Sequence, residues 1–132
     1  MSSKDEEHHV ELVKGLSDQM KPIMDGTEQP MFIYLDDNHK ACNNRLASML
    51  GYKSPHEWAE KAGFLDLFVD EKSRETLSSA YWDTMNKMMA STIQLTWMKR
   101  DGVKLDSTMI LVPMFFQGHL FAVHFVTSFT AK

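Results

Sequence analysis

Cysteine is nearly absent from this chain of 132 residues, since Cys42 is the only one. A single cysteine excludes an internal disulfide framework and a structural zinc site built from cysteines. No apolar run approaches the roughly 18 residues that a membrane span needs, and the charged residues 1–7 lack the apolar segment of a signal peptide. These absences predict a cytoplasmic protein with no membrane partner.

Basic clusters and glycine-rich loops are missing as well. The chain has 14 basic and 18 acidic residues, for a net charge of −4, and no cluster of lysines and arginines could form the basic face of a duplex-binding protein. Its 6 glycines form no phosphate loop, and no Gly-x-Ser-x-Gly nucleophile elbow occurs. We therefore expect no nucleic-acid partner, and these motifs do not favour an enzyme.

The first segment has the spacing of an amphipathic helix over residues 5–25, because apolar residues recur along it at steps of three and four. Pro22 is expected to kink or end this helix, and Asp25-Gly26-Thr27 is a stop signal. Two heptads are too few for a stable free coiled coil. The helix is therefore expected to lie on another surface.

From Pro30 onward, strand and helix signals alternate. Residues 31–35 and 39–42, separated by a turn signal, predict a hairpin. Helical spacing over 43–50 stops at Gly51. Ser54 with Pro55 and Glu57 marks the start of a further helix, which Gly63 ends, and an apolar turn follows over 64–68.

The second half of the chain predicts one helix and three strands. The helix, over 70–90, is expected to be the longest, with an apolar stripe that comprises Leu77, Tyr81, Trp82, Met85, Met88 and Met89. The strands are expected over 93–98, 103–116 and 119–129, with turns between them. This order predicts an α+β domain, with a five-stranded antiparallel sheet, helices on one face and an additional N-terminal amphipathic helix.

Several short motifs and single residues, at particular places in this order of strands and helices, resemble those of a known sensory family. They are Asp36 at the end of the first strand, Asn43 eight positions before Gly51-Tyr52, the stretch Ser54-Pro55-His56-Glu57-Trp58, the hairpin Trp97-Met98-Lys99-Arg100-Asp101-Gly102, Pro113, and Ser128-Phe129-Thr130. At this spacing, residues 30–130 resemble a PAS (Per-Arnt-Sim) domain. The resemblance divides the chain into an N-terminal helix and linker, 1–29, and a PAS-like domain, 30–130.

The resemblance also limits which cofactors this chain could bind. PAS domains bind flavin, haem, small metabolites, lipids or nothing, and many dimerise. The Gly-x-Asn-Cys-Arg-Phe-Leu-Gln motif of the cysteinyl-flavin branch is absent after Gly63. The helix over 70–90 has no histidine to serve as a haem ligand, which leaves only His124 or a methionine such as Met85, Met88 or Met98. A non-covalent flavin or another small apolar ligand remains open.

Alternation along the strands, set in the family register, separates two faces of the sheet. The inward face is expected to line a ligand pocket made by Leu35, Cys42, Leu46, Leu50, Met85, Met109, Leu111, His124 and Val126. The outward face is apolar, and a solvated face should be polar. The N-terminal helix is therefore expected to cover it, from the same protomer or a partner, in an interface of Val10, Val13, Met20, Ile110, Val112, Phe121, Val123 and Phe125.

Histidines raise two separate questions. His124 stands inward, where family members often carry glycine, and it could fill space, contact a polar group of a ligand, or ligate a haem or metal. The other histidines show no His-x-x-x-His or His-x-x-Glu-His spacing, and His8-His9 is expected on the solvated surface. The sequence therefore predicts no metal site.

These observations favour a cytoplasmic PAS sensory module that binds a mostly apolar small molecule and signals through homodimer packing, to a downstream signalling protein or effector domain. The alternative is a protein-interaction module whose pocket is filled by its own side chains. A third interpretation, a small α+β enzyme with a cone-shaped pocket, would have His124 as its only acid or base.

Overall fold

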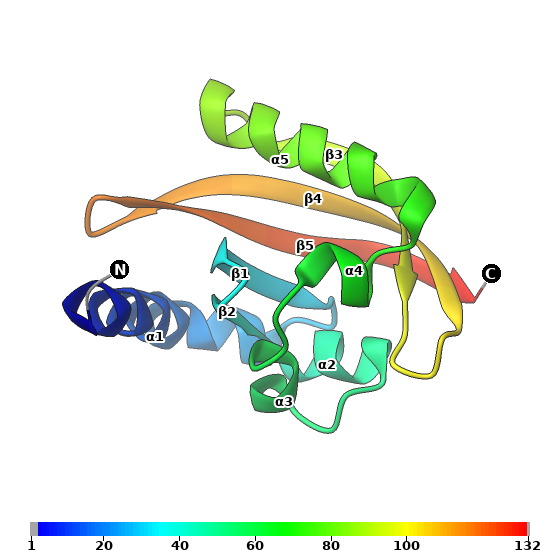
Figure 1. The fold of residues 1–132 in the computed structure, drawn as a ribbon, viewed down its shortest axis with the longest axis horizontal. Helices are drawn as coiled ribbons and strands as arrows, with labels where there is room; N and C mark the ends of the chain where they lie inside the picture. The colour runs from blue at the N-terminus through cyan, green and yellow to red at the C-terminus, as the bar shows by residue number, and fades with distance from the viewer. Residues whose placement is uncertain (1–2, 132) are drawn as a thin grey trace.

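The sheet is antiparallel throughout and has the strand order β2-β1-β5-β4-β3 (Figure 1). The computed structural model describes residues 3–131, with side chains from Glu6 onward. The strands are β1 (Met31–Asp36), β2 (His39–Cys42), β3 (Ser91–Met98), β4 (Lys104–Phe116) and β5 (His119–Ala131). The α+β class and the five antiparallel strands predicted from the sequence are confirmed.

Helices flank this sheet and connect its second and third strands. They are α1 (Ser3–Gly26), α2 (Asn44–Leu50), α3 (Pro55–Ala59), α4 (Phe64–Phe68), the 3-10 turn η1 (Glu71–Ser73) and α5 (Arg74–Lys87). Sequence signals set several of these ends. The Ser54 hydroxyl accepts a hydrogen bond from the Glu57 amide at 3.0 Å, and Gly51 closes α2 in the left-handed region, as predicted.

The inner face of the sheet and helices α2–α5 enclose the main core. Strand residues Leu95, Trp97, Met109, Leu111 and Val126 all point into it, which confirms the inward register predicted for β3, β4 and β5. They pack against Leu46, Leu50, Trp58, Phe64, Phe68 and Leu77 from the helices. This core fixes the position of every element that borders the inner face.

Helix α1 covers the outer face of its own sheet. Leu12, Leu16, Met20 and Met24 pack on a second cluster of strand residues, comprising Met31, Ile33, Phe121 and Val123. The predicted covered face is therefore confirmed, and the cover belongs to the same protomer. Figure 1 places the start of α1 beside the turn between β4 and β5, and His8 and His119 have ring centroids 5.0 Å apart there.

The helix predicted over residues 5–25 is confirmed as α1, whereas the end of the helix predicted over 70–90 was wrong. Pro22 does not end α1, which continues to Gly26, because Met20 and Met24 on either side of it are buried on the sheet while Pro22 itself faces solvent. The helix predicted over 70–90 ends at Lys87, since Met88 adopts a left-handed conformation. With 14 residues it is shorter than α1, which has 24.

The apolar stripe predicted for α5 is confirmed at Leu77 and Tyr81 and was wrong at Trp82, Met88 and Met89. The buried residues of the helix are Leu77, Ala80 and Thr84, whereas Trp82, Met88 and Met89 are exposed. The polar Thr84 is accommodated there because its hydroxyl forms a hydrogen bond of 2.7 Å with that of Ser91. The segment 64–68, predicted as a turn, is the short helix α4, and Gly63 precedes it instead of ending α3.

Candidate functional site

A cleft of about 430 Å³ opens between the inner face of the sheet and helices α4 and α5. Its volume falls in the range of small-molecule sites. The side chains that line it are mostly aromatic and apolar, with a few polar ones among them. They are Phe32, Tyr34, Asp37, Phe64, Leu65, Asp66, Leu77, Ser78, Tyr81, Trp82 and His124.

His124 forms part of the base of the cleft. Its ring stacks on Phe32, with centroids 3.9 Å apart and planes inclined by 7°. Burial lowers the pKa of His124 to about 3, and the neighbouring carbonyls of Ala122 and Phe32 only partly oppose this shift. The imidazole is therefore neutral near pH 7. Its buried Nδ1 makes no hydrogen bond within the described chain.

Two tyrosines form one wall of the cleft. Tyr34 extends from β1 and Tyr81 from α5, and their rings meet edge to face with centroids 5.6 Å apart. The Tyr34 hydroxyl donates a hydrogen bond to Asp37, and burial raises the pKa of both phenols. Both are therefore neutral near pH 7. They place hydroxyl groups next to the aromatic surface of the cleft.

Lys40 holds the β1–β2 hairpin at the rim of this cleft. Its ammonium group donates to the carbonyls of Asp37, Ala59 and Lys61, and lies over the Trp58 ring at 5.3 Å from the centroid. Burial lowers the pKa of Lys40. The side chain thus joins the hairpin to the segment after α3, and its role is structural.

Most of the nine residues predicted to line a ligand pocket lie outside this cleft. Of the nine, only His124 lines the cleft. Six pack in the main core, namely Cys42, Leu46, Leu50, Met109, Leu111 and Val126. Cys42 is buried there as an apolar side chain, and burial raises its pKa to about 12.

The two remaining predicted residues lie elsewhere. Leu35 packs against the outer cluster, because alternation along β1 turns Phe32 and Tyr34 inward and Ile33 and Leu35 outward. Met85 is half-buried and does not border the cleft. The missed lining residues Phe32 and Tyr34 could have been found by applying alternation to the first strand as well.

The histidine prediction also needs correction. His8 is exposed, as expected, but His9 is half-buried, and it lies near His39 with ring centroids 5.2 Å apart. The two residues are 30 positions apart in sequence, so no short spacing motif could have detected the pair.

Comparison with solved structures identifies the architecture. A PAS domain from a two-component sensor histidine kinase superimposes with a TM-score of 0.64 at 15% identity, over 90% of this chain and 99% of that chain. A PAS domain from Colwellia psychrerythraea matches with a TM-score of 0.67 at 14% identity, over 86% and 95%. This chain has the PAS fold.

A eukaryotic PAS domain, from the fruit-fly ELK potassium channel, matches equally well, with a TM-score of 0.64 at 12% identity over 84% of this chain and 94% of that one. No protein-family model and no curated protein matches the sequence. In the described part of the chain, no helix is long and apolar enough to cross a membrane. The likeness is therefore one of fold, and the cleft must be interpreted from its own residues.

Proposed function

We propose that this PAS domain is a sensory module that binds a small, mostly apolar molecule in the cleft beside His124. The observation that carries the proposal is an aromatic cleft of about 430 Å³ with a neutral imidazole at its base. Clefts that combine apolar walls with a few convergent polar groups are the usual form of small-molecule sites.

The lining favours a flat, uncharged ligand. Phe32, Phe64 and Tyr81 offer aromatic surface, against which rings pack face to face or edge to face. Asp37 and Asp66 near the rim oppose the entry of an anion. A neutral imidazole donates a hydrogen bond from one ring nitrogen and accepts one at the other. A ligand therefore needs only a single polar group to pair with His124.

Strand β1 connects the cleft to α1. Phe32 lines the cleft, whereas its neighbours Met31 and Ile33 pack under α1 on the other face. A ligand that displaces Phe32 would change the packing beneath α1. The signal would then be a shift between two arrangements of α1 on the sheet, stabilised to different extents by the ligand.

A homodimer is the second part of the proposal. Val13, Met20, Phe121 and Val123, predicted at an interface between protomers, are buried within one chain. Ile110, Val112 and Phe125 on the outer face stay partly exposed. Ile110 lies opposite Phe125 across β4 and β5, so the three form a continuous apolar strip. We expect two copies to meet through this strip, next to α1.

The ligand proposal is tested by native mass spectrometry of freshly purified protein, followed by a screen of neutral aromatic fragments. The informative variant is His124→Phe, which keeps the stacking on Phe32 and removes the polar atoms. Fragments with a hydrogen-bonding group are expected to bind it at least about tenfold more weakly, the loss of about 1.4 kcal/mol that one hydrogen bond represents.

The matched control is His56→Phe, because His56 is exposed on α3 and remote from the cleft lining. It should leave fragment binding unchanged. If no fragment binds the wild-type protein, or if His124→Phe binds all of them normally, the ligand role of this cleft is wrong. The alternative of a pure interaction module would then stand.

A further inference from the structure

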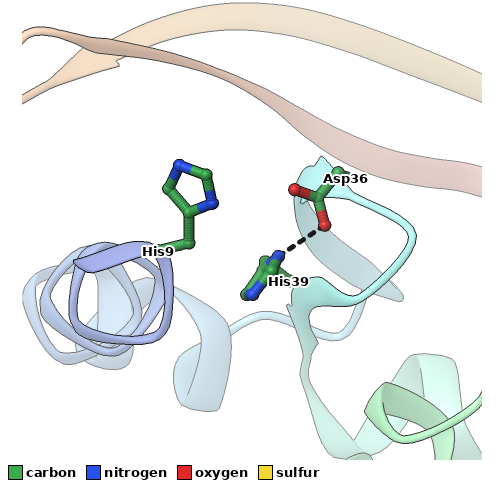
Figure 2. A group of neighbouring side chains, drawn as sticks. All are labelled: His9, Asp36 and His39. Carbon is green, nitrogen blue, oxygen red and sulfur yellow. Dashed lines mark hydrogen bonds and ion pairs between the residues drawn. The ribbon is translucent and has the colours of Figure 1, made fainter. Parts of the chain in front are cut away.

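Three metal-ligating side chains, none of which lines the cleft, converge elsewhere in the fold. His9 comes from α1, Asp36 from the end of β1 and His39 from the start of β2 (Figure 2). One ligand atom from each lies within 4.8 Å of the others. They meet on the outer side of the sheet, where the first half of α1 passes the β1–β2 hairpin.

His39 is held in a defined orientation. Its side chain is only 3% exposed. Its Nδ1 lies 2.6 Å from Asp36 Oδ1, and its Nε2 lies 3.0 Å from Glu6 Oε1. Because a carboxylate oxygen only accepts, the proton of His39 lies on Nδ1, which donates to Asp36, and the buried Nε2 makes no hydrogen bond within the described chain. An ion bound at Nδ1 would displace this proton to Nε2, beside the Glu6 carboxylate. This arrangement, with an outer carboxylate on the second nitrogen, is typical of metal-bound histidine.

His9 supplies an independent observation. Its Nδ1 is buried and makes no hydrogen bond within the described part of the chain. Buried polar atoms are almost always paired, so an unpaired nitrogen requires an explanation. Figure 2 shows a ring nitrogen of His9 on the side that faces Asp36 and His39. A cation between the three residues would satisfy it.

We propose that His9, Asp36 and His39 bind a zinc ion. Two imidazoles and one carboxylate are ligands that Zn²⁺ accepts in tetrahedral sites, whereas Ca²⁺ and Mg²⁺ take oxygen ligands. Bonds of about 2.0–2.2 Å place tetrahedral ligands about 3.3 Å apart. The three ligand atoms now lie within 4.8 Å of one another, so small rotations of the side chains would bring all three to bonding distance of one ion. Water fills the fourth position.

The zinc site goes beyond the ligand-sensing proposal and does not depend on it. It would tie the first half of α1 to the β1–β2 hairpin, through His9 and His39, which are 30 positions apart in the sequence. His8 and His119 lie at its edge, since His119 has ring-centroid distances of 5.0 Å to His8 and 6.3 Å to His9. The predicted consequence is a metal-dependent attachment of α1 to the sheet.

The experiment uses the complete chain without a histidine tag, after treatment with a chelator. Zn²⁺ is titrated in competition with a chromophoric chelator, and Co²⁺ is used in parallel because its visible spectrum reports coordination geometry. The wild-type protein is expected to bind one equivalent of each ion, with a tetrahedral Co²⁺ spectrum. A zinc concentration a hundredfold above Kd is expected to raise Tm by about 10 °C.

The principal variant is His9→Gln, because His9 is only half-buried and its loss should leave the fold intact. It is expected to bind Zn²⁺ at least about tenfold more weakly, since loss of even an outer-shell partner has that effect. Asp36→Asn should behave alike. His56→Gln is the matched control, because His56 also pairs with a carboxylate, Glu60 at 2.8 Å, on a remote surface.

Two results would overturn the proposal. The wild-type protein could fail to bind a stoichiometric ion, in which case the His39–Asp36 contact is a hydrogen bond alone. Alternatively, His9→Gln and His56→Gln could bind Zn²⁺ as tightly as the wild-type protein, which would place the ion elsewhere. Fragment binding in the cleft is measured separately, so the zinc proposal and the ligand proposal can each fail without affecting the test of the other.

Discussion

Asn43 joins α1 to the rest of the domain through a single side chain. Its Nδ2 donates to the carbonyls of Met24 at 3.1 Å and Gln29 at 3.0 Å. Its Oδ1 accepts from the amides of Met31 and Leu46, both at 3.0 Å. The residue thus caps α2 and at the same time fixes the end of α1 against the start of β1. All of these bonds are partly or fully removed from water.

We predict that Asn43→Ala lowers the free energy of unfolding by about 3 kcal/mol, because a lost cap costs about 1 kcal/mol and buried groups left unpaired cost about as much again each. Denaturant unfolding measures this. Asn44→Ala, at an exposed neighbouring position, is the control and should change stability by about 0.5 kcal/mol or less. Equal effects of the two variants would contradict the structural role of Asn43.

His124 predicts a pH dependence of stability. Burial holds its pKa at about 3 in the folded chain, below the ordinary 6.5. Between these values the unfolded chain binds a proton that the folded chain does not, so stability falls as the pH falls below 6.5. From pH 7.5 to pH 5 the loss attributable to this residue is about 2 kcal/mol. His124→Phe should lack it.

The measurement is a pair of denaturant-unfolding series at pH 7.5 and pH 5, on the wild-type protein and on His124→Phe. Other ionisable groups contribute equally to both, so the difference between the two slopes isolates His124. His56→Gln, which changes an exposed histidine, should keep the wild-type slope. Identical slopes for wild type and His124→Phe would mean that His124 does not stay uncharged in the fold.

Side chains that act locally were predictable, and those that act across the fold were not. Ser54 caps the helix that begins one residue later, and this pattern is visible in four consecutive letters. Lys40 donates to Ala59 and Lys61, about 20 residues away, and no local pattern encodes such bonds. Asn43 was recognised through the family resemblance, but its bonds to Met24 and Gln29 depend on the position of α1.

Among the helices, α1 depends on a close approach at Gly15. A Cβ added there would lie 3.0 Å from Cζ of Phe116, on the β4–β5 hairpin. The absence of a side chain lets the helix lie near the strand pair. Leu12 and Leu16, on the neighbouring turns, are almost completely buried as a result.

We predict that Gly15→Leu destabilises the docking of α1 by about 1–3 kcal/mol, the usual cost of overpacking, although leucine favours helix more than glycine does. Hydrogen exchange of α1 amides should report local loosening. Gln19→Leu adds the same side chain at an exposed position of the same helix and is the control. Unchanged exchange in Gly15→Leu would mean that Phe116 moves aside at no cost.

Strand faces were predictable, whereas the buried face of α5 was predicted only in part. Alternation in a strand has a period of two, so a single family register assigned Met109, Leu111 and Val126 correctly. In α5 the apolar residues lie on more than one face, and the core accepts the face of Leu77 and Ala80, leaving Trp82 exposed. Only the position of the helix on the sheet decides between these faces.

The location of the cleft follows from how the domain fills its interior. Large side chains such as Trp58, Trp97 and Phe68 occupy the centre of the inner face completely. The cleft lies to one side of these residues, between the sheet and helices α4 and α5, beside Tyr34 and Tyr81. The resemblance predicted an inner pocket, but packing among specific side chains decided which part of that face stays open.

The outer face leads to the prediction about assembly. Helix α1 covers Phe121 and Val123 but leaves Ile110, Val112 and Phe125 partly exposed, and β3 beyond them presents the polar residues Thr92 and Gln94. Apolar residues flanked by a polar rim are typical of a protein contact. A second copy of this chain presents the same strip, which suits the self-complementary contact of a two-fold dimer.

We predict that the wild-type chain is a dimer in light-scattering chromatography and that Ile110→Lys raises its dissociation constant at least about tenfold, because a charge in an apolar contact loses its hydration. Thr92→Lys is the matched control, since Thr92 pairs with Ile110 across β3 and β4 and is already exposed. It lies on the polar rim, where a charge stays solvated. A monomeric wild-type chain, or equal dissociation of both variants, would refute this interface and leave signalling to the movement of α1 within one protomer.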